Sequence, residues 1–409
     1  MMKKVLFVDD ERKILSSLNR LMIDVDYDIL TAESGQEALE ILEEEPDIDL
    51  IISDMRMPYM TGYELLSIVK QKYPKVIRVI LSGYTDEKII YKALQENVAK
   101  IYLLKPWKGD SMLREIEHIF ETEAFINSPE IIAAVNNAGI IKSMPDNYQK
   151  ILDLIDSEAS MEEISRYISE DVALTTNVLR IANSAFFGAK TGAVKTALQF
   201  IGTQSLSTFI RMTALLESVR STDYKKHLPY LDNLWRHAFL TNRIFHFIYK
   251  DVYKESVPVS GNSAGLLHNI GKAVMLKIYG DEYLPFMRKE KVYEASLEYP
   301  DIIQAEQEKF ATTHQQIGAY LLDGWDFPYP IIEGTLYHHD PLNEKIVNKK
   351  LVSSLHIAQK CAYDLMMVGQ IQTGQQQAYA YSMAFYPEVF EHTNVGQDEM
   401  LDRIKEFKL

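Results

Sequence analysis

Acidic, hydroxyl and cationic side chains stand directly after four short apolar runs in the first hundred residues. Asp9 and Asp10 follow the first run and Asp54 follows another, while Ser82 and Lys105 follow two later ones. Crowded carboxylates repel one another, and Mg²⁺, which prefers oxygen ligands, relieves that repulsion. Asp54 is then suited to attack a phosphoryl group, with Lys105 and Ser82 contacting the phosphoryl oxygens. The alternative is a set of unrelated strand-end caps, which four coincident strand ends make improbable.

These side chains meet only if the apolar runs are strands of one parallel sheet. Runs rich in β-branched residues alternate with amphipathic stretches of helical period, which is typical of βαβ units. Chemistry in such sheets gathers at the carboxyl ends of the strands. We therefore predict an α/β domain with a doubly wound, five-stranded parallel sheet, closed by a helix over 109–124. The expected strands are 4–8, 27–31, 50–53, 76–81 and 101–104, and the expected helices are 11–22, 34–45, 62–72 and 86–97.

Residues 1–123 resemble a response-regulator receiver domain, which has a flavodoxin-like fold. The matching residues are Asp9, Asp10, Asp54 with Met55 and Pro58, Ser82-Gly83, Tyr102 and Lys105-Pro106. The resemblance implies that a sensor histidine kinase or phosphotransfer protein phosphorylates Asp54. It also implies that Ser82 and Tyr102 move when phosphate arrives. The Mg²⁺ ligands that it implies are Asp9, Asp10, Asp54 and the main-chain carbonyl of Arg56.

After residue 125 the strand–helix alternation stops and helical periods dominate, which predicts an all-α region. The expected helices are 129–138, 146–156, 161–169, 172–182, 204–216, 230–249 and 262–278. Nine of the ten histidines lie in this part of the chain. Neutral imidazole is a common metal ligand, so a softer ion such as Zn²⁺ or Ni²⁺ is one interpretation. The other interpretation is that each is a helix-surface histidine or a hydrogen-bonded core histidine.

Several motifs follow one another in order: 183–188 (Asn-Ser-Ala-Phe-Phe-Gly), Trp235-Arg236-His237, 265–271 (Gly-Leu-Leu-His-Asn-Ile-Gly), the stretch 314–322 that begins with His314, and His338-His339. Their order over about 130–365 resembles HDOD, the HD-related output domain, a relative of HD-type metal phosphohydrolases. HD enzymes need a His, a His-Asp pair and a later Asp, and the matching positions here are His237, His268-Asn269 and Gln359. The two amides are neutral and do not offset the charge of a metal that must activate water. We therefore favour an empty relict site over a second metal. Its residues would be His237, His268, Asn269, His314, His338, His339 and Gln359.

Composition narrows the function classes. Acidic residues number 58 and basic residues 43, for a formal net charge of −15, which disfavours nucleic-acid binding and a transcription factor. Cys361 is the single cysteine, so a disulfide framework is excluded. No run approaches the ~20 apolar residues of a membrane helix, and Val5–Val8 is too short for a signal peptide. We expect a cytoplasmic protein without a membrane partner.

The predicted organisation is a receiver over 1–123, a linker near 109–128, an HDOD domain over 124–365 and a helical extension over 366–409. The predicted function is that of a two-component phosphorelay regulator. Phosphorylation of the receiver would control a non-hydrolytic HDOD module that binds an unknown protein partner, with a homodimer as one possibility. The alternative is a metal-dependent HD-type phosphohydrolase acting on a nucleotide or cyclic dinucleotide.

Overall fold

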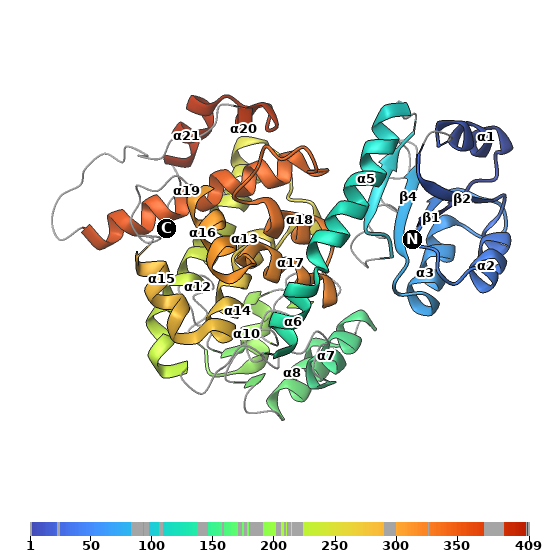
Figure 1. The fold of residues 1–409 in the computed structure, drawn as a ribbon. Coiled ribbons are helices and arrows are strands. Elements are labelled where there is room, and N and C mark those ends of the chain that lie inside the picture. Colours follow the sequence, from blue (N-terminus) through green and yellow to red (C-terminus); the bar gives the residue numbers. More distant parts are fainter. Residues whose placement is uncertain are drawn as a thin grey trace. The chain divides into compact units, whose positions relative to one another are not determined.

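The computed structural model contains two compact units, one centred on Met1–Ala124 and the other on Phe125–Trp325 with Pro330–Leu409 (Figure 1). The described residues are 2–22, 25–82, 93, 98–105, 109–137, 146–157, 159–170, 191–201, 224–289, 300–325, 327–371, 388–405 and 407, with isolated positions between 174 and 214.

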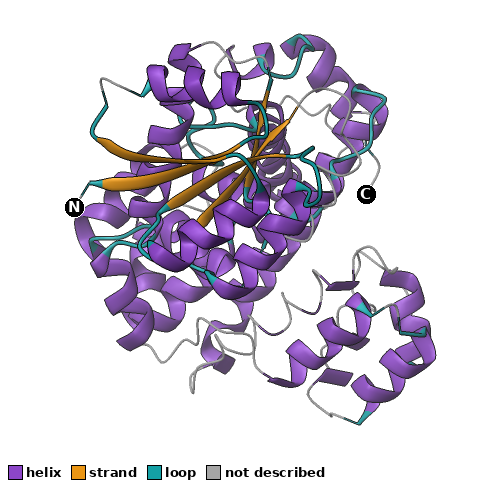
Figure 2. Ribbon diagram, turned by 90° about the vertical axis from the view of Figure 1, so that its right-hand side faces the viewer, coloured by secondary structure: helices purple, strands orange, loops and turns teal. Residues whose placement is uncertain are grey.

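The first unit is built on one parallel sheet, drawn in orange in Figure 2. Its strands are β1 (Lys3–Val8), β2 (Tyr27–Ala32), β3 (Leu50–Asp54), β4 (Ile77–Ser82) and β5 (Ile101–Leu104). They lie in the order β2-β1-β3-β4-β5, and every neighbouring pair is parallel. The predicted five-stranded doubly wound sheet is confirmed.

The strand register places the ends of four strands side by side. Val8 pairs with Ser53, Asp54 with Leu81, and Ser82 with Leu104. The residues that end these strands, or follow them directly, therefore share one edge of the sheet, where ligands of open α/β sheets bind.

The helices of this unit are α1 (Arg12–Leu21), α2 (Gly35–Glu44), α3 (Gly62–Lys72) and α5 (Gly109–Ile126). The Ser34 hydroxyl caps α2, and Thr61 and Glu64 form a capping box at the start of α3, so these two helices begin where a side chain accepts an otherwise unpaired N–H. Alternate residues of the strands, such as Leu6 and Ile51, pack with the apolar faces of α2 and α3. The expected helix at 86–97 lies outside the described residues apart from Ala93.

The second unit consists of helices joined by turns and loops, and its described residues include no strand. Its longer helices are α6 (Pro129–Asn137), α7 (Asp146–Asp156), α8 (Met161–Ser169), α10 (Val194–Ile201), α12 (Tyr224–Phe247), α14 (Ile270–Tyr279), α15 (Tyr283–Lys289), α16 (Pro300–Phe310), α17 (His314–Gly324), α18 (Tyr329–Tyr337), α19 (Lys349–Ile371) and α21 (Gln397–Lys405). Its shorter helices are α13 (Ala264–Leu267), α20 (Glu388–Glu391), the π-helix η1 (Ile248–Val252) and the 3-10 helices η2 (Val259–Gly261) and η3 (Gly280–Glu282). The expected helices at 172–182 and 204–216 lie largely outside the described residues.

One sequence expectation is wrong in this unit. The helical period over 262–278 predicts a single helix, whereas the chain forms α13 and α14 with a turn at His268 and Asn269. Asn269 occupies the N-cap position of α14, where its side chain makes no capping hydrogen bond and its amide donates instead to His268 Nε2 at 2.8 Å. The chain therefore changes direction at His268 and Asn269, and both residues lie in the buried core.

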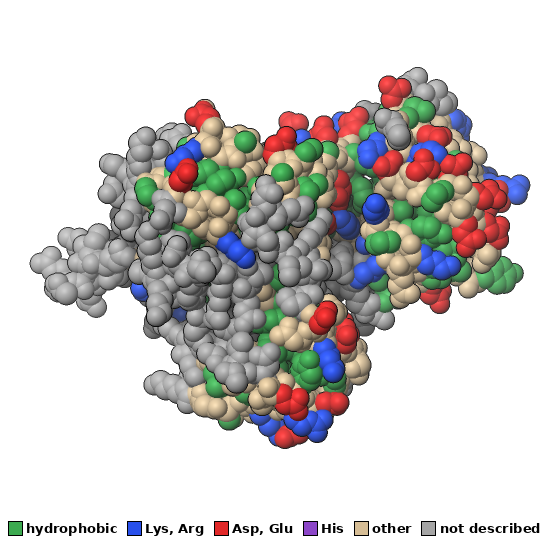
Figure 3. Space-filling view, turned by 60° about the horizontal axis from the view of Figure 1, so that its bottom comes forward, with side chains coloured by type: hydrophobic (Ala, Val, Ile, Leu, Met, Phe, Trp, Pro, Cys, Tyr) green, Lys and Arg blue, Asp and Glu red, His purple; other side chains and the backbone are tan. Residues whose placement is uncertain are grey.

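The described surface is mixed in charge. Figure 3 shows acidic and basic side chains intermingled on one face of the molecule. Among the described helices, none has the length and apolar character needed to cross a membrane.

Candidate functional site

The edge of the sheet in the first unit brings together two buried carboxylates and one ammonium group. Lys105 Nζ lies 2.7 Å from Asp9 Oδ2 and also contacts Asp54 Oδ1. The other Asp54 oxygen accepts the main-chain N–H of Arg56 at 2.7 Å, and Asp9 Oδ1 accepts that of Glu11 at 2.9 Å. Both carboxylates are thus held in fixed orientations at the end of their strands.

Opposing effects set the pKa values of Asp54 and Lys105. Burial raises the pKa of Asp54, while the hydrogen bond and charge of Lys105 oppose the rise. Burial lowers the pKa of Lys105, but its contacts with Asp54 and Asp9 outweigh that effect and the net shift is upward. The ammonium group therefore stays charged at neutral pH. It offsets only one of the two carboxylate charges.

The other predicted residues of this site occupy different environments. Asp10 is exposed beside Asp9, and Ser82 is buried at the end of β4. The main-chain N–H of Lys105 donates to the carbonyl of Ser82 at 2.8 Å, which ties the ends of the two strands together. Tyr102 lies on β5, but its side chain falls outside the described part of the structure, as do Gly83 and Pro106.

A glycine allows α3 to begin against the end of β3, the strand that carries Asp54. A Cβ on Gly62 would come within 2.1 Å of the main-chain carbonyl oxygen of Asp54. The Gly62 N–H donates to the carbonyl of Met55 at 3.0 Å. This close approach fixes the loop that carries Arg56, whose main-chain N–H holds Asp54.

The residues of this edge fit a hard divalent cation. Two buried carboxylates share a single ammonium group, and the exposed Asp10 adds a third acidic group at the same strand end. The excess negative charge and the all-oxygen donor set are what Mg²⁺ prefers.

A second cluster lies in the core of the helical unit, where the predicted histidines form a chain of ring contacts. Ring centroids are 5.4 Å apart for His237 and His268, 5.0 Å for His268 and His338, and 4.1 Å for His338 and His339. His314 lies 5.5 Å from His338 and 5.2 Å from His339. The structure thus brings together residues from α12, the α13–α14 turn, α17 and the end of α18.

The side chains at the positions that match an HD site, His237, His268, Asn269 and Gln359, hydrogen-bond to one another or to main-chain carbonyls. His268 Nδ1 donates to the carbonyl of Gly265 at 2.9 Å, and its Nε2 accepts the Asn269 amide at 2.8 Å. His237 Nε2 donates to the main-chain carbonyl of Gln359 at 3.1 Å, and the Gln359 amide donates to the carbonyl of His338 at 2.8 Å. The Asn269 amide therefore occupies the lone pair of His268 that a metal would use.

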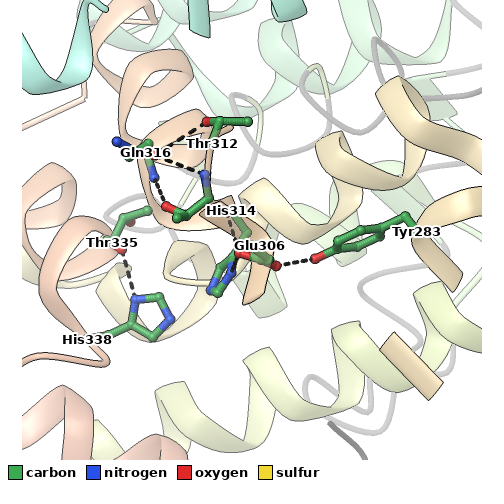
Figure 4. Close-up of polar contacts among 8 residues, drawn as sticks. Tyr283, Glu306, Thr312, His314, Gln316, Thr335 and His338 are labelled. Atoms are coloured by element: carbon green, nitrogen blue, oxygen red, sulfur yellow. Dashed lines mark hydrogen bonds and ion pairs between the residues drawn. The ribbon is translucent and has the colours of Figure 1, made fainter. Parts of the chain in front are cut away.

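Unlike His268, which has hydrogen-bond partners on both ring nitrogens, His314 and His338 are each bonded through Nδ1 (Figure 4). His314 Nδ1 lies 2.7 Å from Glu306 Oε2, and the same oxygen accepts the His314 main-chain N–H at 2.9 Å. Tyr283 donates its hydroxyl to the other Glu306 oxygen at 2.8 Å. His338 Nδ1 donates to the carbonyl of Thr335 at 2.8 Å. In both rings Nε2 is buried and has no hydrogen-bond partner among the described residues.

Burial keeps these imidazoles uncharged. It lowers the pKa of His237 to about 3 and lowers the pKa values of His268, His338 and His339 well below the ordinary value. The pKa of His314 is also lowered by burial, although Glu306 opposes the shift. Neutral imidazole is the form that binds metals.

Two residues of this cluster were not assigned a role from the sequence. Lys272 is almost fully buried, and its charge lowers the pKa of five neighbouring histidines. Glu306 is buried on α16 between Ile302 and Phe310. Helical spacing could have identified both residues. Lys272 lies four residues after His268, and Glu306 lies four residues from both Ile302 and Phe310. Residues four apart share a helix face, so each of the two is expected on a buried face.

Comparisons with known proteins identify both units. A family model described as the response regulator receiver domain matches residues 5–117, and one described as the HDOD domain matches 141–341. The hydrogenase transcriptional regulatory protein HoxA of Cupriavidus necator is 35% identical over 119 residues, 29% of this chain and 24% of that protein. An uncharacterized protein of Treponema pallidum is 24% identical over 221 residues, 53% of this chain and 41% of that protein.

This chain therefore spans less than half the length of these two curated relatives. A solved structure, the signal receiver domain of an HD domain-containing protein from Pseudomonas fluorescens, is 33% identical, with a TM-score of 0.28, and covers 30% of this chain and 96% of that one. None of these findings supports the alternative of an HD-type phosphohydrolase. The chain contains an N-terminal response regulator receiver domain followed by a C-terminal HDOD domain.

Proposed function

We propose that Asp54 is the phosphoacceptor of this regulator and that a histidine kinase or phosphotransfer protein is the phosphodonor. The observation that carries the proposal is the environment of the Asp54 carboxylate. It lies at a strand end between the Lys105 ammonium group and the Arg56 N–H, beside a second buried carboxylate. That arrangement orients one nucleophilic oxygen and places a cation where phosphoryl charge would develop.

The transfer balances as a displacement at phosphorus. An Asp54 oxygen attacks the phosphoryl group of a phosphohistidine, the new O–P bond forms, the N–P bond breaks, and the imidazole nitrogen takes up a proton. Lys105 pairs with a phosphoryl oxygen, for which it must leave Asp9 or Asp54. Ser82 contributes its hydroxyl as a hydrogen-bond donor from the end of β4, and we assign Tyr102 on β5 the role of a switch residue.

The residues that would hold Mg²⁺ are Asp9, Asp10, Asp54 and the Arg56 carbonyl. When bound, the ion would offset the charge of the carboxylates and of the incoming phosphoryl group.

The HDOD domain acts in this proposal as a binding module rather than a hydrolase. Asn269 and Gln359 stand where an HD enzyme needs carboxylates, and both amides are engaged in hydrogen bonds with the histidine cluster. The phosphorylated receiver would change the binding of a downstream protein partner, through the segment 109–128 or through a homodimer.

Phosphoryl uptake from radiolabelled acetyl phosphate with Mg²⁺ tests the assignment of Asp54. We expect one labelled group per chain, and its loss in Asp54→Asn. Asp47→Asn, which changes an exposed acid on the same unit, should label like the parent. Labelling of Asp54→Asn as strong as that of the parent would refute the assignment.

A further inference from the structure

We propose that Tyr59 is the residue through which this receiver recognises a protein phosphodonor. Its ring would pack against an apolar side chain close to the phosphohistidine of a histidine kinase or phosphotransfer protein. The inference rests on the proposed role of Asp54 as phosphoacceptor, because a donor must come to Asp54 to meet the loop that carries Tyr59. It adds a residue that would distinguish a protein donor from a small one.

The first argument is the exposure of Tyr59. It exposes 107% of its reference surface area, whereas the other exposed large apolar residues in the described part of the chain, Met2 and Phe125, expose 58% and 47%. A ring with that exposure gains no stabilisation from packing inside its own domain.

The second argument is the backbone conformation. The Met60 N–H donates to the carbonyl of Pro58 at 2.8 Å, which makes Tyr59 the central residue of a γ-turn. The φ of Tyr59 is 66°, in the region that glycine adopts freely and that a bulky side chain adopts only at a cost. A single exposed aromatic residue is ordinary on a protein surface. An exposed aromatic residue in a strained turn is not, and strain that packing does not offset points to a role outside the folded chain.

The third argument is that the loop holds this ring outward. Met57 is buried in the core of the receiver. The Met60 side chain packs against the start of α2, where a Cβ on Gly35 would come within 2.6 Å of its sulfur. Anchored methionines therefore lie on both sides of Tyr59, which cannot turn inward without displacing them. A ring presented in a fixed place loses little conformational entropy on binding.

The fourth argument is position. The loop over 55–62 begins directly after Asp54, and the Gly62 N–H closes it on the carbonyl of Met55 at 3.0 Å. Tyr59 therefore lies on the same edge of the sheet as the Asp54 carboxylate. Acetyl phosphate is too small to cover this loop while it reacts at Asp54. A folded protein that brings a phosphohistidine to Asp54 must cover the surrounding surface.

The chemistry of the loop favours an apolar contact on the partner. Tyrosine offers a large ring with few rotamers and is enriched among the residues that dominate binding at protein interfaces. Pro58 is exposed next to Tyr59, so the two form a small apolar surface. Asp10 and Arg56, also exposed at this edge, are charged. An aliphatic or aromatic side chain near the donor histidine would fit between these charged groups and cover the Tyr59 ring.

Phosphoryl transfer from two donors to the full chain tests the proposal. The small donor is radiolabelled acetyl phosphate with Mg²⁺. The protein donor is the phosphorylated kinase or phosphotransfer protein that labels the parent fastest among all those encoded by the same organism. We expect Tyr59→Ala to lower kcat/KM for the protein donor by about tenfold or more through a raised KM, and to leave labelling by acetyl phosphate within about twofold of the parent. Tyr59→Phe keeps the ring and should retain most of the transfer.

Two further variants separate recognition from folding. Met2→Ala removes another exposed apolar side chain, at the opposite end of β1 from the Asp54 edge, and should accept phosphate like the parent. Tyr59→Gly should melt at a higher temperature than Tyr59→Ala, because glycine adopts a φ of 66° without strain. It should nevertheless accept phosphate from the protein donor as poorly as Tyr59→Ala does. A merely structural role for Tyr59 would instead make the glycine variant the better acceptor.

Transfer from the protein donor to Tyr59→Ala at the rate of the parent would overturn the proposal. An equal loss with both donors would also overturn it, because Tyr59 would then act in the chemistry at Asp54 rather than in recognition. A third contradicting result is that no protein donor labels the parent faster than acetyl phosphate at the same concentration. The phosphoacceptor assignment is judged separately, since it fails only if Asp54→Asn still takes up label from acetyl phosphate.

Discussion

Gly271 of α14 lies directly against the main-chain carbonyl of His314 at the start of α17. A Cβ on Gly271 would come within 1.7 Å of that oxygen, and within 2.9 Å of the Gly318 nitrogen one turn later. Only glycine permits this approach, which sets the distance between the helix that carries Lys272 and the helix that carries His314.

Gly271→Ala should therefore destabilise the helical unit by about 1–3 kcal/mol, because the two backbones must separate to admit a methyl group. Urea unfolding followed by circular dichroism measures the change. Gly192→Ala is the matched control, since a Cβ there meets nothing within 4 Å. Unfolding of both variants at the same urea concentration would contradict this prediction, because it would mean that α14 and α17 can separate at no cost in stability.

Lys105→Met should destabilise the receiver at pH 7, because it leaves Asp9 and Asp54 together without their cation. Since the lysine side chain is 22% exposed, we expect a loss of about 1–3 kcal/mol, below that of a fully buried pair. The difference from the parent should narrow as the pH falls and the carboxylates protonate, and Mg²⁺ should restore part of it. Lys13→Met on the exposed face of α1 is the control. A loss that does not change with pH would contradict the electrostatic explanation.

Tyr283→Phe should lower the stability of the helical unit by about 1–3 kcal/mol, because it removes a hydrogen-bond donor from a buried carboxylate. Glu306 would then hold His314 less firmly. Tyr279→Phe removes a weaker hydroxyl bond, 3.2 Å to the carbonyl of Phe310, and should cost less. Urea unfolding measures both variants, and unchanged unfolding of Tyr283→Phe would show that Tyr283 does not stabilise Glu306.

Acidification should unfold the helical unit through its buried histidines. Six of them have pKa values lowered by burial: His237, His268, His314, His338, His339 and His356. In the unfolded chain each takes up a proton below about pH 6.5, whereas in the folded chain it does not. Stability is therefore fully present above pH 6.5 and falls below it, by up to about 1.4 kcal/mol per pH unit for each histidine.

Thermal unfolding of chelator-treated protein between pH 7.5 and 5 measures this slope. His356→Asn removes one titrating group, so the number of protons taken up on unfolding, which sets this slope, should fall by about one. A melting temperature that stays constant over this range would show that the histidines are already protonated in the fold.

The receiver site was predictable because a parallel sheet converts sequence position into spatial position. A residue that follows an apolar strand must lie at the carboxyl edge, so Asp9, Asp54 and Lys105 could be placed together from their positions alone. The specific pairing of Lys105 with both carboxylates could not, because it depends on side-chain conformation.

Fewer contacts in the helical unit could be predicted from the sequence. Helix periodicity carries no information on which helices pack together, so the ring contacts of His314 with His338 and His339 had no signature in spacing. The turn at His268 and Asn269 was missed because the surrounding apolar period continues unbroken. The hydrogen bonds of His268 with Asn269, of His314 with Glu306 and of His338 with Thr335 depend on the folded structure and could not be predicted from the sequence.

The strands β3 and β4, which end at Asp54 and Ser82, are the most deeply buried segments of the receiver. Every residue of β3 and β4 is buried, and both strands pair with a neighbour on each side. Amide hydrogens of such segments exchange with solvent chiefly through global unfolding rather than local opening. Asp54 is therefore attached to the slowest-exchanging part of its domain, and its position should persist through any fluctuation that leaves the sheet intact.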